Sequence, residues 1–172
     1  KLRQTGKLRG STYGGREKGV AHYSSAALML PQLAAKTRDE AIAELSARLA
    51  EEGFVQDAEA LTDMAIRREE VAPTAIGKGI AFPHVRGIEG GGLTFALGLK
   101  RAGIDFGAPD RAKCRLIFFS LIPTAASAFY LKLIATLTDV FRDTEARKTL
   151  LAASTPEETW ETLEELTRQA IK

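Results

Sequence analysis

The sequence predicts an α/β protein in which a mixed β-sheet lies between helices. Helical patterns with one apolar face occupy residues 37–71 and 124–172, and short apolar runs separated by glycine and proline lie between them. The run "CRLIFFSLI" at residues 114–122 is apolar on both faces. A central strand that is covered by helices on both sides of its sheet has this pattern. We therefore expect helices on both faces of the sheet.

The composition is typical of one compact domain. The chain has 172 residues, of which 45% are hydrophobic. Its longest apolar runs fall short of the roughly 20 residues that a helix needs to cross a bilayer, and no secretory signal opens the sequence. We therefore expect no membrane insertion and a cytoplasmic location. One cysteine, Cys114, excludes an internal disulfide, and with only two histidines an ordinary zinc site is not expected.

Residues 1–25 form a basic segment with six basic residues and one glutamate. We interpret this segment as an arm, or as the remnant of an upstream segment, ahead of a domain over residues 26–172. A basic arm can contact nucleic acid, but no aromatic stacking pattern accompanies this one, so we do not expect nucleic-acid binding. An alternative interpretation takes residues 2–17 as the end of a small DNA-binding wing.

Two helices are expected before the strands, and capping residues mark their ends. Thr37 and Glu40 form a capping-box pair at the start of the first helix, which stops at Gly53. Asp57 begins the second helix, and Pro73 prevents its continuation.

Three helices are expected after the strands. The first spans residues 127–143, a shorter one follows near residues 144–153, and the last begins at Thr155 with Pro156 in its first turn. The apolar face that we expect on the first of them is formed by Leu131, Ile134, Thr138 and Phe141.

His84 is the strongest candidate for a residue that takes part in a reaction. A neutral imidazole can attack phosphorus or move protons near neutral pH without special activation. Pro83 stiffens the backbone before it, while Gly77 and Gly79 let backbone amides approach an anion. Positive charge for a phosphoryl group is available nearby in sequence from Arg68, Lys78 and Arg86. A lone histidine is more often an ordinary loop residue, so local chemistry alone does not decide its role.

Six segments, taken together, indicate a protein family more specifically than the histidine does alone. They are "IRREEV", "TAIGKGIAFPHVR", "GIDFGAPD", "CRLIFFSLIP", "LKLIATLTDVFRD" and "LLAASTPEE". In order and spacing, over about residues 26–170, they resemble the IIA domains of the bacterial phosphoenolpyruvate-dependent sugar phosphotransferase system. The resemblance is to the mannitol/fructose type, which includes the nitrogen-regulatory IIA proteins. It implies the family fold, a mixed sheet between helices.

The resemblance also implies a function. In that family, the histidine matching His84 accepts a phosphoryl group from a small histidine phosphocarrier, and passes it to a IIB partner or holds it as a regulatory mark. The matching active-site arginine is Arg68, and no metal or organic cofactor is required. Tyr130 stands where members often carry a second histidine. Its hydroxyl can hydrogen-bond, but the side chain cannot become cationic.

The leading hypothesis is therefore a regulatory phosphohistidine protein. In it His84 attacks phosphorus, Tyr130 orients the site, and Arg68, Arg86 and the segment Gly77–Lys78–Gly79 bind the phosphoryl oxygens. Two alternatives remain open. One is a sugar-transport relay that passes phosphate to a IIB partner, and the other is a binding module that controls a kinase or transporter without being phosphorylated. Whether the chain acts as an enzyme also stays open.

Overall fold

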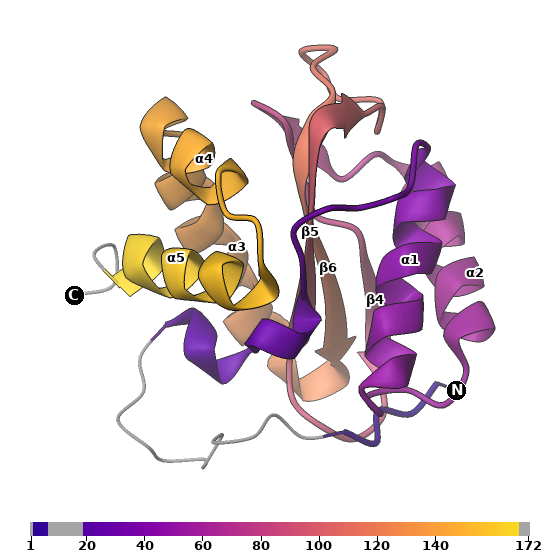
Figure 1. Ribbon diagram of the computed structural model, residues 1–172. Helices are drawn as coiled ribbons and strands as arrows, with labels where there is room; N and C mark the ends of the chain where they lie inside the picture. The colour runs from indigo at the N-terminus through magenta and orange to yellow at the C-terminus, as the bar shows by residue number, and fades with distance from the viewer. Residues whose placement is uncertain (1, 7–18, 169–172) are drawn as a thin grey trace.

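A computed structural model describes residues 2–6 and 19–168 of the chain (Figure 1). Within these residues a mixed β-sheet lies between two helical layers, with α1 and α2 on one face and α3, α4 and α5 on the other. The α-helices are α1 (Arg38–Glu51), α2 (Ala58–Val71), α3 (Ser127–Phe141), α4 (Thr144–Leu151) and α5 (Pro156–Arg168). Short 3-10 helices are η1 (Val20–His22), η2 (Ala26–Leu28) and η3 (Thr124–Ala126). The predicted fold class is confirmed.

The sheet is built around one long strand, β6. The six strands are β1 (Met29–Leu30), β2 (Ala75–Gly77), β3 (Ile80–Ala81), β4 (His84–Ile88), β5 (Thr94–Ile104) and β6 (Cys114–Pro123). β5 pairs with β6 antiparallel, while β3 and β4 both pair with β6 parallel. β1 extends the sheet beyond β5, and β2 extends it beyond β3. The prediction that residues 114–122 form a covered central strand is confirmed.

A break at Phe82 and Pro83 separates β3 from β4. The Phe82 amide donates to the Thr74 carbonyl at 3.2 Å, and the Pro83 carbonyl accepts from the Ser120 amide at 3.1 Å. Because proline has no N–H and a fixed φ, it interrupts the ladder at this point. β4 therefore begins at His84, and its first residue lies opposite Ser120 of β6.

The predicted caps of α1 and α2 are confirmed. The Thr37 hydroxyl accepts from the Glu40 amide at 3.2 Å. The Asp57 carboxylate accepts from the Ala60 amide at 2.9 Å. Each cap satisfies a backbone donor that has no partner inside the helix, so both helices start where the sequence indicates.

The predicted buried face of α3 is wrong by one residue at three of its four positions. The helix buries Tyr130, Leu133, Leu137 and Phe141, whereas Leu131 is 64% exposed. Tyr130 turns toward His84 on the sheet, and the 3.6-residue period then carries the buried face through the other three residues. Phe141 is the residue that the predicted and observed faces share.

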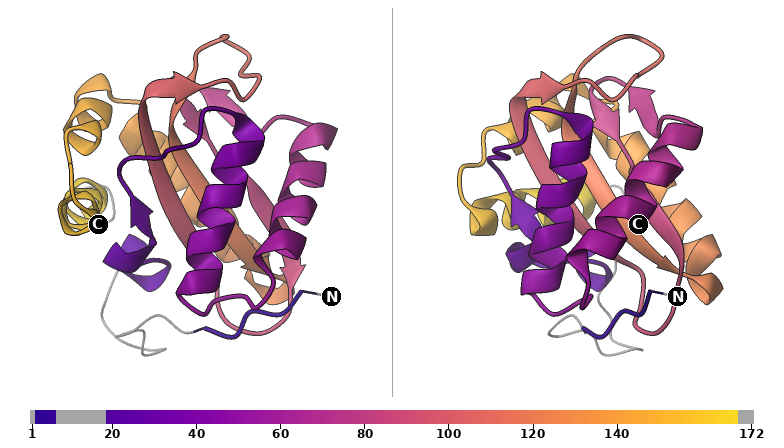
Figure 2. Two further views of the ribbon diagram at one scale, coloured as in Figure 1. Left: turned by 45° about the vertical axis from the view of Figure 1, so that its right-hand side comes forward. Right: turned by 90° about the vertical axis from the view of Figure 1, so that its right-hand side faces the viewer.

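The N-terminal residues 2–6 lie against the lower ends of α1 and α2 (Figure 2). The Gln4 amide donates to the Glu89 carbonyl at 2.7 Å, and the Thr5 amide donates to the Phe54 carbonyl at 2.8 Å. The Gln4 side chain is buried and donates to the Thr94 hydroxyl at 2.7 Å. Residues 19–25 of the predicted basic arm are also described and include η1. Residues 1 and 7–18 of this arm, and most of the alternative DNA-binding wing, lie outside the described residues.

Phe118 of β6 lies at the centre of an aromatic cluster in the core. Its ring centroid is 5.5 Å from that of Phe82 and 5.9 Å from those of Phe95 and Phe141. Cys114 is buried at the start of the same strand, and burial raises the pKa of its thiol to about 12. No helix in the described part of the chain is long and apolar enough to span a bilayer.

We expect Phe118→Ala to lower the free energy of unfolding by about 3–5 kcal/mol, because it removes a buried ring and leaves a cavity. Phe129→Ala is the matched control, since Phe129 is 56% exposed on α3. Its effect is expected within ~0.5 kcal/mol, as for an ordinary surface position. Urea unfolding measures both. Equal losses in the two variants would contradict the placement of this core.

Candidate functional site

His84 lies at the point where strand β4 leaves the Phe82–Pro83 break. Its side chain is buried, with 5% of the residue exposed. The ring Nδ1 lies 2.9 Å from the Phe82 carbonyl oxygen. Because a carbonyl oxygen only accepts, the proton of the neutral imidazole must sit on Nδ1. The lone pair available for attack is therefore on Nε2.

The other ring nitrogen of His84, Nε2, lies in a different environment. Nε2 is buried and has no hydrogen-bond partner among the described residues. A buried nitrogen that keeps an unused lone pair is uncommon in folded proteins and calls for an explanation. A nucleophile that bonds only to an incoming group satisfies this requirement.

Burial keeps this imidazole neutral. The pKa of His84 is lowered from 6.5, chiefly by burial and against the opposing hydrogen bond from the ring to Phe82. The positive charges of Arg68 and Arg86 lower this pKa further. Near neutral pH the ring therefore holds one proton and one free lone pair.

Tyr130 of α3 packs directly on His84. Their ring centroids are 5.4 Å apart, and the Tyr130 hydroxyl lies 3.3 Å from Nδ1 of His84. Since Nδ1 carries the proton, the hydroxyl oxygen acts as a second acceptor beside the Phe82 carbonyl. Burial raises the pKa of Tyr130 to about 12, so the phenol stays neutral.

Two arginines bring positive charge to this cluster from different elements. Arg86, two residues beyond His84 on β4, is exposed, and its Cζ lies 5.4 Å from the centre of the Tyr130 ring. Arg68, near the end of α2, donates from Nη1 to the Ala72 carbonyl at 3.0 Å. Neither guanidinium forms an ion pair with a carboxylate of residues 2–6 or 19–168. Two unpaired cations beside a neutral imidazole suit an anion.

The structure does not bring the segment Gly77–Lys78–Gly79 to His84. The Gly79 carbonyl accepts from Arg115 and Leu116 at the start of β6, whereas His84 pairs with Ser120. At about 3.3 Å per strand residue this separates the segment from His84 by roughly 13 Å. The expected phosphate-binding role of these three residues is therefore not supported.

The glycines serve a tight turn instead. All three residues have positive φ, namely 97° at Gly77, 58° at Lys78 and 80° at Gly79. The Lys78 amide already donates to the Asp110 carboxylate at 2.8 Å, so it is not free to bind another anion. Backbone conformation thus explains the glycine pattern that sequence reasoning assigned to phosphate.

Sequence reasoning missed the Phe82 carbonyl, which sets the tautomer. Every residue has a backbone carbonyl, so the sequence does not show which carbonyl accepts a hydrogen bond. The order Phe-Pro-His was the one available signal, because the residue before proline is restricted to extended conformations.

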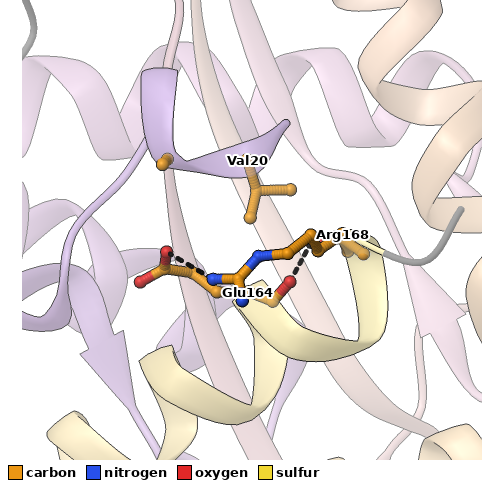
Figure 3. A pocket seen from close by; sticks show the side chains of 5 residues that line it. Val20, Glu164 and Arg168 are labelled. Atoms are coloured by element: carbon orange, nitrogen blue, oxygen red, sulfur yellow. Dashed lines mark hydrogen bonds and ion pairs between the residues drawn. The ribbon is translucent and has the colours of Figure 1, made fainter. Parts of the chain in front are cut away.

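A separate hollow, to which His84 does not contribute, lies between η1 and α5 (Figure 3). It is lined by Val20, Ala21, Glu164, Thr167 and Arg168, and its volume is about 20 Å³. That is room for one water molecule. Within residues 2–6 and 19–168, no group of three histidine, cysteine, aspartate or glutamate side chains is arranged to hold a metal ion.

Comparison with known proteins identifies the family. Residues 24–166 match the family described as "Phosphoenolpyruvate-dependent sugar phosphotransferase system, EIIA 2". The chain belongs to this family. As an EIIA type-2 domain, it is a phosphoryl-carrier component of phosphotransferase systems. The family expected from the six sequence segments is confirmed.

Sugar-specific relatives and nitrogen-regulatory relatives have the same sequence identity to this EIIA domain. It is 30% identical to the fructose-specific EIIA component of Haloferax volcanii over 130 residues, which cover 76% of this chain and 84% of that protein. It is also 30% identical to a nitrogen regulatory protein of Bradyrhizobium diazoefficiens over 125 residues, which cover 73% of this chain and 81% of that protein. Identity alone does not separate sugar transport from regulation.

Solved structures show the same fold. The nitrogen regulatory protein IIA-Ntr of Neisseria meningitidis aligns with a TM-score of 0.73 at 24% identity, over 81% of this chain and 95% of that one. Mannitol enzyme IIA of Escherichia coli, in its complex with phosphorylated enzyme IIB, aligns with a TM-score of 0.65 at 21% identity. That alignment covers 82% of this chain and 96% of the matched chain.

We expect the imidazole of His84 to titrate below pH 6.5, and the free energy of unfolding to respond to pH accordingly. Between the folded-state pKa and 6.5, the unfolded chain binds more protons than the folded one, so stability rises with pH. This contribution is present above pH 6.5 and is lost as the pH falls through the lowered pKa. NMR titration of a His22→Gln variant, which keeps only one histidine, measures the midpoint.

Urea unfolding across the same pH range completes the measurement. His84→Gln in the same background should flatten the pH dependence of stability in this window. A midpoint at or above 6.5 would contradict the buried neutral imidazole.

Proposed function

We propose that this EIIA domain accepts a phosphoryl group on Nε2 of His84 from a small histidine phosphocarrier, and holds it chiefly as a regulatory mark. The observation that carries the proposal is the hydrogen bond from Nδ1 to the Phe82 carbonyl. This bond leaves Nε2 with the lone pair, in a site that two unpaired guanidiniums make positive.

The transfer exchanges one P–N bond for another. The Nε2 lone pair attacks phosphorus in line with the P–N bond of the donor phosphohistidine. As the new bond forms, the old one breaks and its electron pair returns to the donor imidazole. The proton on Nδ1 of His84 stays in place, where the Phe82 carbonyl stabilises the positive charge that the ring gains.

Arg68 and Arg86 are the ligands that we propose for the phosphoryl oxygens. Their guanidiniums offer paired N–H donors that match phosphate geometry, and their charge offsets the charge brought by the phosphoryl group. The exposed position of Arg86 on β4 lets it meet an incoming donor, whereas Arg68 approaches from α2. These two residues thus supply the positive charge without a metal or an organic cofactor.

We expect incubation with phosphoenolpyruvate, the general kinase of the system and its phosphocarrier to add one acid-labile phosphoryl group, which His84→Ala abolishes. Intact-protein mass spectrometry at neutral and acid pH measures the modification. His22→Ala is the control, because it removes the other histidine and leaves the proposed nucleophile. An unmodified wild-type protein under saturating donor would refute the proposal.

The same assay compares two adjacent arginines. Arg68→Ala should slow acceptance by roughly 100-fold, the scale for losing one donor to a developing charge. Arg67→Ala is the matched control, since Arg67 is exposed and donates to the Asp63 carbonyl one turn earlier.

Tyr130 favours regulation over sugar relay as the output. When the phosphoryl group leaves His84, electron density returns to the imidazole, and a cationic neighbour would stabilise it. Tyr130 remains a neutral phenol with a raised pKa of about 12 and contributes no such charge. We therefore propose slow onward transfer, with a cytoplasmic kinase or transporter as the regulated partner. The relay to a IIB partner is the second candidate function.

We expect the phosphorylated protein to keep its phosphoryl group when it is mixed with fructose-type or mannitol-type IIB domains. Tyr130→His should speed the transfer by roughly 10-fold or more, because it restores a side chain that can carry charge. Tyr130→Phe, which removes the hydroxyl alone, is the control. Loss of the phosphoryl group from wild-type protein within seconds would instead assign the chain to the sugar relay.

A further inference from the structure

A buried carboxylate in the last turn of α2 has no part in the transfer described above. Glu69 is 1% exposed, and it follows Arg68 directly in the sequence. No cationic side chain within the described ranges forms an ion pair with it. A buried charge is costly unless strong hydrogen bonds compensate it, so its placement requires an explanation.

The compensation comes from a single residue, Thr74. Its amide donates to Oε2 of Glu69 at 2.6 Å, and its hydroxyl donates to Oε1 at 2.6 Å. Hydrogen bonds to an ionised carboxylate are short and roughly twice as strong as neutral ones. Both carboxylate oxygens are thus engaged, and Thr74 is held firmly at the end of the connection between α2 and β2.

A continuous series of hydrogen bonds leads from Thr74 to the imidazole. The Thr74 carbonyl accepts from the Phe82 amide at 3.2 Å. The Phe82 carbonyl in turn accepts from Nδ1 of His84 at 2.9 Å. Glu69 is therefore linked to the His84 imidazole through two residues, Thr74 and Phe82.

We propose that Glu69 is a positioning residue for His84. Through Thr74 and Phe82 it keeps the Phe82 carbonyl directed at Nδ1, which holds the ring in the tautomer that leaves Nε2 free to attack. The second nitrogen of a histidine is controlled in this way at many functional sites. This inference rests on the proposed function for its effect on rate, but its effect on the tautomer stands on the structure alone.

The last turn of α2 thus contributes two residues to the site. Arg68 brings a guanidinium toward the imidazole, and Glu69 points into the protein and braces the loop that carries the acceptor for Nδ1. A shift of this turn would disturb the phosphate ligand and the nucleophile together.

The test measures the ¹⁵N shifts of the His84 ring in a His22→Gln background, at a pH above its titration. The parent protein should show one protonated and one free ring nitrogen, assigned to Nδ1 and Nε2. Glu69→Gln should move the two shifts toward each other as the tautomers mix, and should lower the rate of phosphoryl acceptance about 10-fold. Glu70→Gln makes the same charge change at an exposed neighbour and is the matched control.

Two variants of Thr74 keep the test decisive if Glu69→Gln does not fold. Thr74→Val removes the hydroxyl donor and should reproduce both effects, whereas Thr74→Ser restores the donor and should behave as the parent. Unchanged ring shifts, or a rate equal to that of Glu70→Gln, in a folded Glu69→Gln or Thr74→Val protein would overturn the inference. If the parent itself accepts no phosphate, the proposed function fails, and the ring shifts still decide the positioning role.

Discussion

The hydrogen bond between Nδ1 of His84 and the Phe82 carbonyl is the interaction on which the site depends. It assigns the ring proton to one nitrogen and leaves a lone pair on the other. Burial then keeps the ring neutral, so that this lone pair is available at neutral pH. Without this bond the same residues would be present, but neither ring nitrogen would be assigned the lone pair.

The sheet explains how one backbone carbonyl acquires this role. Pro83 interrupts the strand, and pairing with β6 on both sides of the interruption prevents the loop from drifting. The strand β4 lies between the two helical layers (Figure 1). Tyr130 of α3 contacts His84 at the start of β4, and the charge of Arg68 on α2 acts on the same imidazole. Residues far apart in sequence meet there because β4 lies beside the central strand.

Local patterns predicted the elements well and the contacts between them less well. The caps at Thr37 and Asp57 lie where the sequence places them, since a capping bond involves residues three apart. The predicted buried face of α3 was shifted by one residue at three of four positions, because Tyr130, which carries a polar hydroxyl, is buried against His84. The Gly77–Lys78–Gly79 segment was assigned to phosphate because strand register, which places it at the far end of β6, leaves no trace in local composition.

By itself, the sequence determined the helices, the central strand and the family, and it singled out His84 as the candidate nucleophile. These features follow from side-chain identity and periodicity, which are local properties of the chain. The tertiary structure alone decided which nitrogen of His84 is free and which cations surround it. It also showed that Glu69 is tied to His84 through Thr74 and Phe82. Those features depend on backbone carbonyls and on strand register. Many different sequences can produce the same backbone arrangement, so the identity of a single side chain does not reveal it.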